Sequence, residues 1–251
     1  MSWFVLLLPV AAIAAVWWRR RTQGSRQREL MLLCERAGLE FAPLDLREDT
    51  AWLPFPMFGK ARSGTENVIW DPRLGDGTYV FDYWYEDDAE EPTISGRRWL
   101  TCAVIPLPST GPRLSVVPRD APVGLTMAPA WTEVRLELDA FDRRFRVGSE
   151  DRRFAVALLD QRMMQALLSL PEAVVADVSE DVLLLRGPRM PAGQMILLLD
   201  TASRLHRAIP RVVSSLFPPR PSEGGFEDRW LQGRWSPAPT EAAVLPRASS
   251  S

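Results

Sequence analysis

The chain opens with a long apolar run that extends from Trp3 to Trp18 without a charged residue. As an α-helix rising about 1.5 Å per residue, these roughly sixteen residues cover ~24 Å, somewhat less than the ~30 Å hydrocarbon core of a bilayer. A span of this length inserts when the bilayer thins locally and flanking arginines reach the headgroups. The pattern predicts a transmembrane anchor over residues 1–21. The residues expected at its two interfaces are Trp3, Trp17, Trp18, Arg19, Arg20 and Arg21.

The charges around this run predict which side of the membrane holds the rest of the chain. Met1 and Ser2 bring no charged side chain before the run, whereas Arg19–Arg21 follow it. Because cytoplasmic flanks collect Lys and Arg, we expect an uncleaved single-pass anchor with the bulk of the chain in the cytoplasm. The alternative is cleavage after the small residues Ala12–Ala14, although a secretory leader normally begins with positive charge.

Beyond the anchor, helical spacing gives way to alternation of apolar and polar residues. A helix is predicted over Gln27–Ala37, ended by Gly38. Its apolar stripe consists of Leu30, Leu33, Cys34 and Ala37. The period-2 segments that follow predict strands joined by short loops, which favours an antiparallel meander. These strands are Tyr79–Glu86, Trp99–Ile105, Leu114–Val117, Trp131–Leu138 and one marked by Phe141, Phe145 and Val147.

Helical spacing returns in the second half of the chain. The residues from Asp151 to Leu170 predict one amphipathic helix, and a helix from about Pro191 should kink or end at Pro210. Two short strands are predicted between these helices, Ala173–Val178 and Val182–Leu185, across the turn Ser179–Asp181. Strands followed by helices indicate an α+β fold. We therefore expect an N-terminal transmembrane helix followed by an antiparallel-sheet domain with packed helices. The expected organisation is an anchor (1–21), a juxtamembrane helix and linker (22–57), an α+β domain (58–217) and a disordered tail (218–251).

Composition excludes several classes of function. The 251 residues carry a net charge of −2, which argues against a nucleic-acid-binding domain. Lys60 is the single lysine among 30 basic residues. This bias indicates a genome rich in G and C, so the arginines are not evidence of phosphate binding. Two cysteines, Cys34 and Cys102, are too few for a disulfide framework, and we expect both to be reduced packing thiols.

No catalytic, cofactor or metal site emerges from the sequence. His206 is the single histidine, which excludes Ser-His-Asp, Cys-His and multi-histidine designs, and we expect it on the surface. A group of acidic residues lacks the regular spacing of a calcium loop and is typical of a solvated hairpin tip. The group comprises Asp82, Glu86, Asp87, Asp88, Glu90 and Glu91. A carboxylate-based enzyme would use Asp82 and Glu86 as its acids.

An aromatic motif interrupts the Pro-, Ser- and Gly-rich tail. The sequence FEDRWLQGRW places Phe226, Trp230 and Trp235 close together, although disordered segments are poor in aromatic residues. Phe226 and Trp230 are four residues apart, as are Leu231 and Trp235, so one helical turn would present each pair. The motif either docks weakly on its own domain, captures a partner protein, or is part of an idle tail; we predict weak docking.

The stretch FDRRFRVGSEDRRFAVALLDQRMMQALL, from Phe141 to Leu168, resembles the middle of uncharacterised single-pass membrane proteins of high-GC actinobacteria. The resemblance extends from Phe58 to Ile209 and implies an anchor with a cytoplasmic domain, but no activity and no functional residues. We expect a membrane-anchored, non-catalytic binding or scaffold module in the cytoplasm. Its expected partners are the lipid bilayer and an unidentified protein, without nucleic acid, metal or cofactor. The alternatives are an extracytoplasmic binding module, after reversed insertion or leader cleavage, and a carboxylate-based enzyme.

Overall fold

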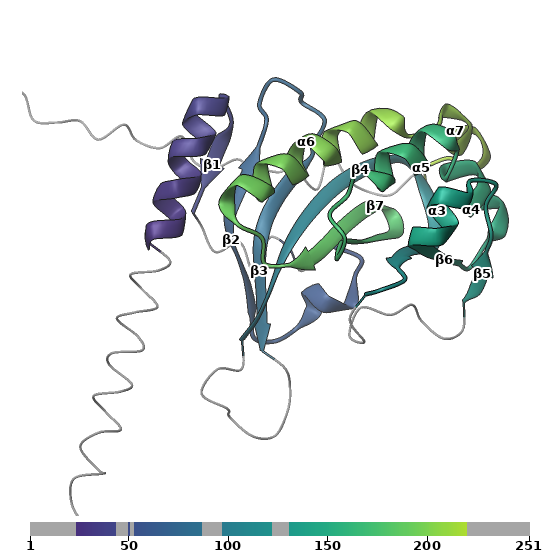
Figure 1. Cartoon of the computed structure of the whole chain (residues 1–251), viewed down its shortest axis with the longest axis horizontal. Helices are drawn as coiled ribbons and strands as arrows, with labels where there is room; N and C mark the ends of the chain where they lie inside the picture. Colours follow the sequence, from purple (N-terminus) through teal and green to yellow (C-terminus); the bar gives the residue numbers. More distant parts are fainter. Residues whose placement is uncertain (1–23, 44–49, 51–52, 87–96, 122–130, 220–251) are drawn as a thin grey trace, which may run out of the picture.

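The computed structural model describes residues 24–43, 50, 53–86, 97–121 and 131–219. In this part of the chain, helices cover one face of an antiparallel sheet (Figure 1). The predicted anchor (1–21) and the aromatic motif of the tail lie outside the described residues. Within the described ranges, no helix combines the length and the apolar character needed to cross a bilayer.

Seven strands make up the sheet in the described part of the chain. They are β1 (Glu40–Ala42), β2 (Ser63–Trp70), β3 (Tyr79–Glu86), β4 (Arg97–Pro118), β5 (Thr132–Val134), β6 (Phe145–Ser149) and β7 (Val175–Pro188). The helical segments are helix 24–37, the short 3₁₀ helix η1 (Pro56–Gly59), α3 (Asp139–Arg144), α4 (Arg152–Leu158), α5 (Gln161–Leu168), α6 (Ala192–Ala208) and α7 (Arg211–Leu216).

Strand β4 is the centre of the topology. Strands β1 to β4 form a meander, and β4 then continues through a bend to pair with β6, which in turn pairs with β5. Strand β7 pairs with β4 on the side opposite β3 and β6. The register of this pairing shifts between Pro106 and Gly111 and again between Gly111 and Leu114. Strand β7 bends at Glu180, whose φ is 55°. Among the described strands, β7 pairs with β4 alone.

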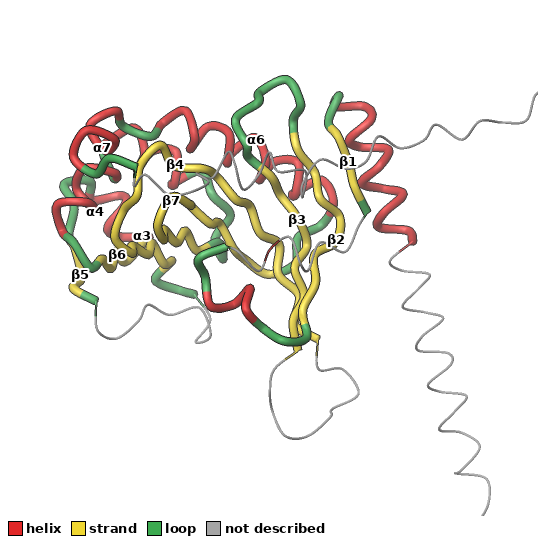
Figure 2. Tube along the Cα trace, turned by 180° about the vertical axis from the view of Figure 1, so that it is seen from behind, coloured by secondary structure: helices red, strands yellow, loops and turns green. Residues whose placement is uncertain are grey.

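The sheet separates two apolar cores. Val80 of β3 faces the larger core, which lies between the sheet and the helices. Phe81 and Tyr83 face the opposite side, where the smaller core lies beneath η1. Figure 2 shows η1 on the side of the sheet away from α6. Here the ring of Phe58 packs edge-on against Tyr83, with centroids 4.8 Å apart, and the Tyr83 hydroxyl donates to the Met57 carbonyl.

The predicted α+β class is confirmed: the sheet is antiparallel and the helices pack on it. The helix that ends at Gly38 is also confirmed, since Gly38 has a φ of +68°. The predicted end of the last helix at Pro210 is also confirmed, because α6 ends at Ala208 and α7 begins at Arg211. The described fold reaches back beyond Phe58. Leu30 of helix 24–37 is fully buried in the larger core, and β1 pairs with β2.

Two predicted strands were separated where the structure has one. Trp99–Ile105 and Leu114–Val117 both belong to β4, and the prolines between them do not end the strand. The neighbouring strands explain why Pro106 is tolerated. Strand β3 begins at Tyr79, which pairs with Val104, so at Pro106 the strand β4 has β7 as its remaining partner. A proline costs little where its missing N–H has no partner to lose. The predicted strands on either side of Ser179–Asp181 are likewise a single bent strand, β7.

Other predicted elements were wrong in type or extent. Of the strand marked by Phe141, Phe145 and Val147, the last two residues lie in β6 as predicted, whereas Phe141 lies in the helix α3. A four-residue spacing of apolar residues is compatible with a helical turn as well as with a strand. Of Trp131–Leu138, the strand β5 comprises Thr132–Val134. The single helix predicted from Asp151 is two helices. Asp160 begins the second of them by accepting a hydrogen bond from the Met163 amide at 2.8 Å. Strands β1 and β2 were not predicted.

Candidate functional site

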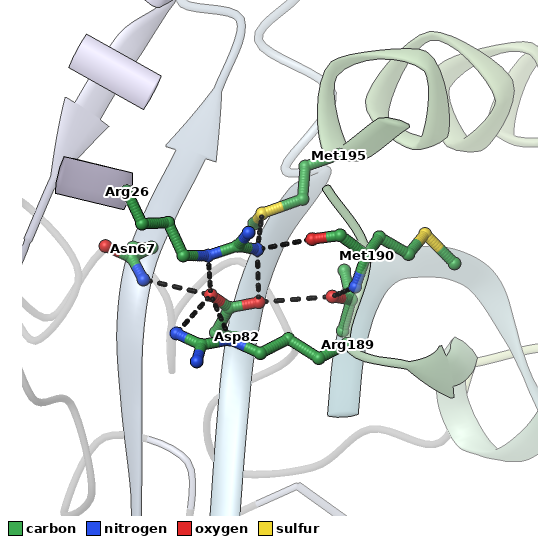
Figure 3. Close-up of polar contacts among 7 residues, drawn as sticks. Arg26, Asn67, Asp82, Arg189, Met190 and Met195 are labelled. Carbon is green, nitrogen blue, oxygen red and sulfur yellow. Dashed lines mark hydrogen bonds and ion pairs between the residues drawn. The ribbon is translucent and has the colours of Figure 1, made fainter. Parts of the chain in front are cut away.

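A buried carboxylate lies where helix 24–37 meets the sheet. Asp82 is in the middle of β3 and points toward the helix layer, the side that its neighbour Val80 also faces. Its side chain has no exposed surface. An isolated buried carboxylate is costly, so its surroundings must replace the water that it has lost. Figure 3 shows the polar groups that do so.

Both carboxylate oxygens of Asp82 accept hydrogen bonds. Arg26 binds in a bidentate manner, with Nε 2.8 Å from Oδ2 and Nη2 3.0 Å from Oδ1. The Asn67 amide donates to Oδ2 at 2.9 Å, and the Thr101 hydroxyl donates to Oδ1 at 3.1 Å. Arg189 adds two longer contacts to Oδ2, each of 3.4 Å. We call these five residues the Asp82 cluster.

The cluster also fixes the segment that enters α6. Nη2 of Arg26 donates to the Met190 carbonyl at 2.6 Å and lies 3.0 Å from the sulfur of Met195 (Figure 3). The Met190 amide in turn donates to the Thr101 hydroxyl at 2.9 Å. Helix 24–37, β2, β3, β4 and the start of α6 therefore meet at one ion-paired centre.

Arg26 reaches Asp82 because it continues the buried stripe of its helix. Leu30 and Cys34 follow it at intervals of four residues, and they are 0% and 1% exposed. The side chain of Arg26 itself is 15% exposed. The sequence contains a partial signal of this contact, because an arginine in line with the buried apolar residues of a helix is directed toward the core, where an acidic partner can bind it.

Asn67 occupies an irregular position in β2. The pairing of β2 with β3 shifts between Glu66 and Ile69, and Asn67 has a φ of 58°. Asparagine tolerates this left-handed conformation better than most residues. It is also the single asparagine of the sequence. Its side-chain oxygen is buried without a hydrogen-bond partner among the described residues, while its amide is directed at Asp82.

A row of stacked side chains continues from the cluster toward the end of the β3–β4 pair. The Arg189 guanidinium lies 3.9 Å from the centre of the Trp99 ring. Burial lowers the pKa of Arg189, and Arg26 lowers it further, whereas Asp82 opposes both. Trp99 pairs with Trp84 across the strands. Arg97 lies 3.7 Å from the centre of the Trp84 ring.

The acidic group of the sequence does not behave as one solvated tip. That prediction is wrong for Asp82, which is buried. Glu86 binds Arg62 at 2.9 Å and Arg97 at 3.2 Å. The other acidic residues of the group, Asp87, Asp88, Glu90 and Glu91, lie outside the described residues. Within the described ranges, no three His, Cys, Asp or Glu residues are grouped so as to hold a metal ion.

The remaining candidate residues have packing environments. Cys34 and Cys102 are both buried and unpaired, on opposite sides of the sheet. Burial and the nearby Glu40 raise the pKa of Cys34 to about 11, and burial also raises that of Cys102. The surface position expected for His206 is incorrect, because His206 is partly buried and its Nδ1 is enclosed. The membrane-flanking residues and the tail motif lie outside the described residues.

A separate hollow of about 440 Å³ lies beside the bend of β4, lined in part by Pro54, Gly111 and Glu180. Two of its three charged lining residues, Arg113 and Glu150, pair with each other, with Arg113 Nε 3.1 Å from the carboxylate. The hollow shares no residue with the Asp82 cluster.

Comparison with known proteins shows the fold and leaves the family open. No family model matches the chain, and no curated protein matches it. The crystal structure of the mycobacterial trehalose monomycolate transport factor A, TtfA, is similar, with a TM-score of 0.53 over 80% of this chain and 99% of that chain. The two sequences are 16% identical, so the similarity concerns the fold alone. The chain thus has a fold similar to that of a mycobacterial transport factor.

Proposed function

We propose that this chain is a membrane-anchored, non-catalytic binding module that holds a partner protein of membrane transport in a fixed position at the bilayer surface. The observation that carries the proposal is the buried contact between Arg26 and Asp82. Arg26 lies five positions after the last arginine of the predicted anchor, Arg21. Helix 24–37, which begins shortly after the predicted anchor (1–21), is fixed to the sheet by this contact.

The attachment of helix 24–37 to the sheet supports a scaffold rather than a loosely tethered domain. A domain on a flexible linker samples many orientations relative to its anchor. Here helix 24–37 carries Leu30 and Cys34 into the core of the domain, and Arg26 is bound at its first turn. A domain fixed to this helix has fewer orientations to lose on binding, which lowers the entropic cost of binding a membrane partner.

The chemistry of the cluster supports a non-catalytic role. A general acid or base needs an oxygen that can reach a substrate proton. Both oxygens of Asp82 are already bonded to donors, and Glu86 lies between two arginines. The two carboxylates that a carboxylate-based enzyme would use thus have structural partners.

The structural neighbour supports a role in transport. TtfA is described as a trehalose monomycolate transport factor. We propose an integral membrane transport protein as the partner of this chain and the cytoplasmic side as its location. The arginines that follow the predicted anchor support that side.

An exchange of the anchor tests the proposal. The full chain and a chain in which residues 3–18 are replaced by an unrelated apolar span would be expressed in an actinobacterial host and crosslinked in intact cells. Both should stay in carbonate-washed membranes and capture the same membrane transport protein, because the domain carries the binding surface. Capture by the native anchor alone would contradict the proposal.

The side of the membrane is a separate arm of this experiment. With the domain in the cytoplasm, a C-terminal alkaline phosphatase fusion should be inactive and a C-terminal fluorescent fusion should be bright. The reverse pattern, or a mature N-terminus near Ala15, would favour the extracytoplasmic alternative.

A further inference from the structure

Helix α7 presents an apolar stripe that the described residues leave open. Val212 and Leu216 are four residues apart, so they lie on one face of α7, and each is 48% exposed. Between them, Val213 is buried in the larger core. Few large apolar side chains are exposed in the described part of the chain. They are Met31, Leu32, Leu74, Val156, Leu197, Val212 and Leu216.

The described chain ends next to this stripe. Phe217 packs edge-on against Phe154 of α4, with ring centroids 5.0 Å apart, and the exposed residues Pro218 and Pro219 follow. Residues 220–251 continue from this point and contain the motif FEDRWLQGRW. From Pro219 to Phe226 the chain spans up to about 24 Å, whereas α7 is about 9 Å long. The motif can therefore return along α7, and Gly224–Gly225 allow the chain to reverse.

The two surfaces are also complementary in chemistry. The motif offers two pairs of apolar residues four apart, Phe226 with Trp230 and Leu231 with Trp235, the spacing at which α7 offers Val212 and Leu216. Glu227 and Asp228 belong to the motif, and the exposed Arg207 and Arg211 precede the stripe. Neither arginine forms an ion pair with the described residues. We propose that residues 226–235 fold back onto α7, with the aromatic rings over the stripe and the acidic residues beside these arginines.

Limited trypsin digestion of the full chain in lipid nanodiscs tests this contact. Trypsin cleaves after Arg229 and Arg234, inside the motif, and after Arg247, in the same tail but outside the motif. The cleavage rate at each of these arginines is divided by the cleavage rate at the same arginine in a synthetic peptide of residues 220–251. This ratio removes the effect of the local sequence on trypsin. A docked motif should be cleaved about tenfold more slowly than the peptide, because cleavage requires opening. Arg247 should be cleaved at the rate of the peptide.

Two variants locate the docking surface. The double substitution Val212→Ser and Leu216→Ser should raise the rates at Arg229 and Arg234 to those of the peptide and leave Arg247 unchanged. Leu197→Ser, at a 65% exposed position on α6, is the matched control and should leave all three rates unchanged. Both substitutions are at exposed sites, so neither should prevent folding.

Several results would overturn the proposal. Equal rates at Arg229 and Arg247 in the native chain would show an undocked motif, available for another protein. Protection that persists in the α7 variant, or that depends on lipid composition, would place the motif on another surface. Protection that rises with protein concentration would assign the occupant of α7 to a second copy of the chain.

Discussion

Asp82 shows how much a single buried charge can organise. Its carboxylate lies in the helix-covered half of the molecule, and it is bound by donors from four other segments. The two arginines are each partly exposed, at 15% and 29% of their side-chain surface, so the positive charges keep some contact with water while the negative charge has none. The cluster is therefore more sensitive to changes of the acid than to changes of either base.

Replacement of Asp82 should test whether the cluster depends on the charge of its acid. Asp82→Asn leaves Arg26 and Arg189 without a counter-charge in a mostly buried site. Removing one member of a buried ion pair typically costs about 3–5 kcal/mol of unfolding free energy. Glu86→Gln is the control on the same strand face, where the partner Arg62 is 77% exposed and a cost of about 1 kcal/mol or less is expected. Urea denaturation of both variants measures the difference, and equal costs would contradict the assigned role of Asp82.

The thiols give a second prediction at this scale. With a pKa of about 11, Cys34 should hold very little thiolate at pH 8, and buried Cys102 even less, so iodoacetamide should label neither until the chain unfolds. The thiol of Cys34 ordinarily titrates near 9.0, so the folded state retains its proton over the interval up to about 11. Stability should therefore fall as pH rises through this interval. Cys34→Ala should reduce the fall, and rapid labelling of the folded chain would contradict the burial.

At the scale of elements, the bend of β4 depends on a glycine. Gly111 lies between the two register shifts of the β4–β7 pairing. A Cβ atom at this position would lie 2.2 Å from the ring of Phe154. That ring is fully buried and packs against Phe217, so it has little freedom to move. The bend thus brings the strand into direct contact with the α4–α7 pair.

Gly111→Ala should therefore disturb both layers. We expect a loss of about 1–3 kcal/mol of unfolding free energy, the usual cost of overpacking a core. Gly193→Ala is the matched control, because a Cβ at Gly193 in α6 would have no atom within 4 Å and alanine favours helix. It should be neutral or stabilising by up to about 1 kcal/mol. Thermal unfolding of the two variants provides the comparison, and a neutral Gly111→Ala would show that Phe154 can yield.

Periodicity predicted elements well where the local pattern is regular and its ends are marked. The alternation of Tyr79–Glu86 gave β3 with its observed bounds, and proline and glycine marked the ends of two helices. Periodicity failed where the extent or the type of an element depends on the segments packed against it. Whether Pro106 interrupts β4 depends on where β3 begins, and the type of α3 depends on what Phe141 packs against. Neither is contained in the local pattern.

At the scale of the whole molecule, the Asp82 cluster was beyond prediction for the same reason. Arg26 and Asp82 are 56 positions apart, and Asp82 and Arg189 are 107 apart. The sequence contained two partial signals, the helical phase of Arg26 and the single Asn67. Without the register of β2, β3 and β4, neither identifies its partner. The acidic run after Asp82 favoured a solvated loop and concealed the buried position of Asp82.

The position of β7 beside β4 also bears on how copies of the protein can associate through the edges of their sheets. An open strand edge is a template for pairing with another chain, and this sheet has three such edges in its described part: β1, β5 and β7. Strands β1 and β5 comprise 3 residues each, too few for a stable intermolecular ladder. Strand β7 is longer, but it bends at Glu180 and carries the charges of Asp177, Asp181 and Arg186. A bent, charged edge fits poorly against a second one, so the fold resists aggregation at high local concentration.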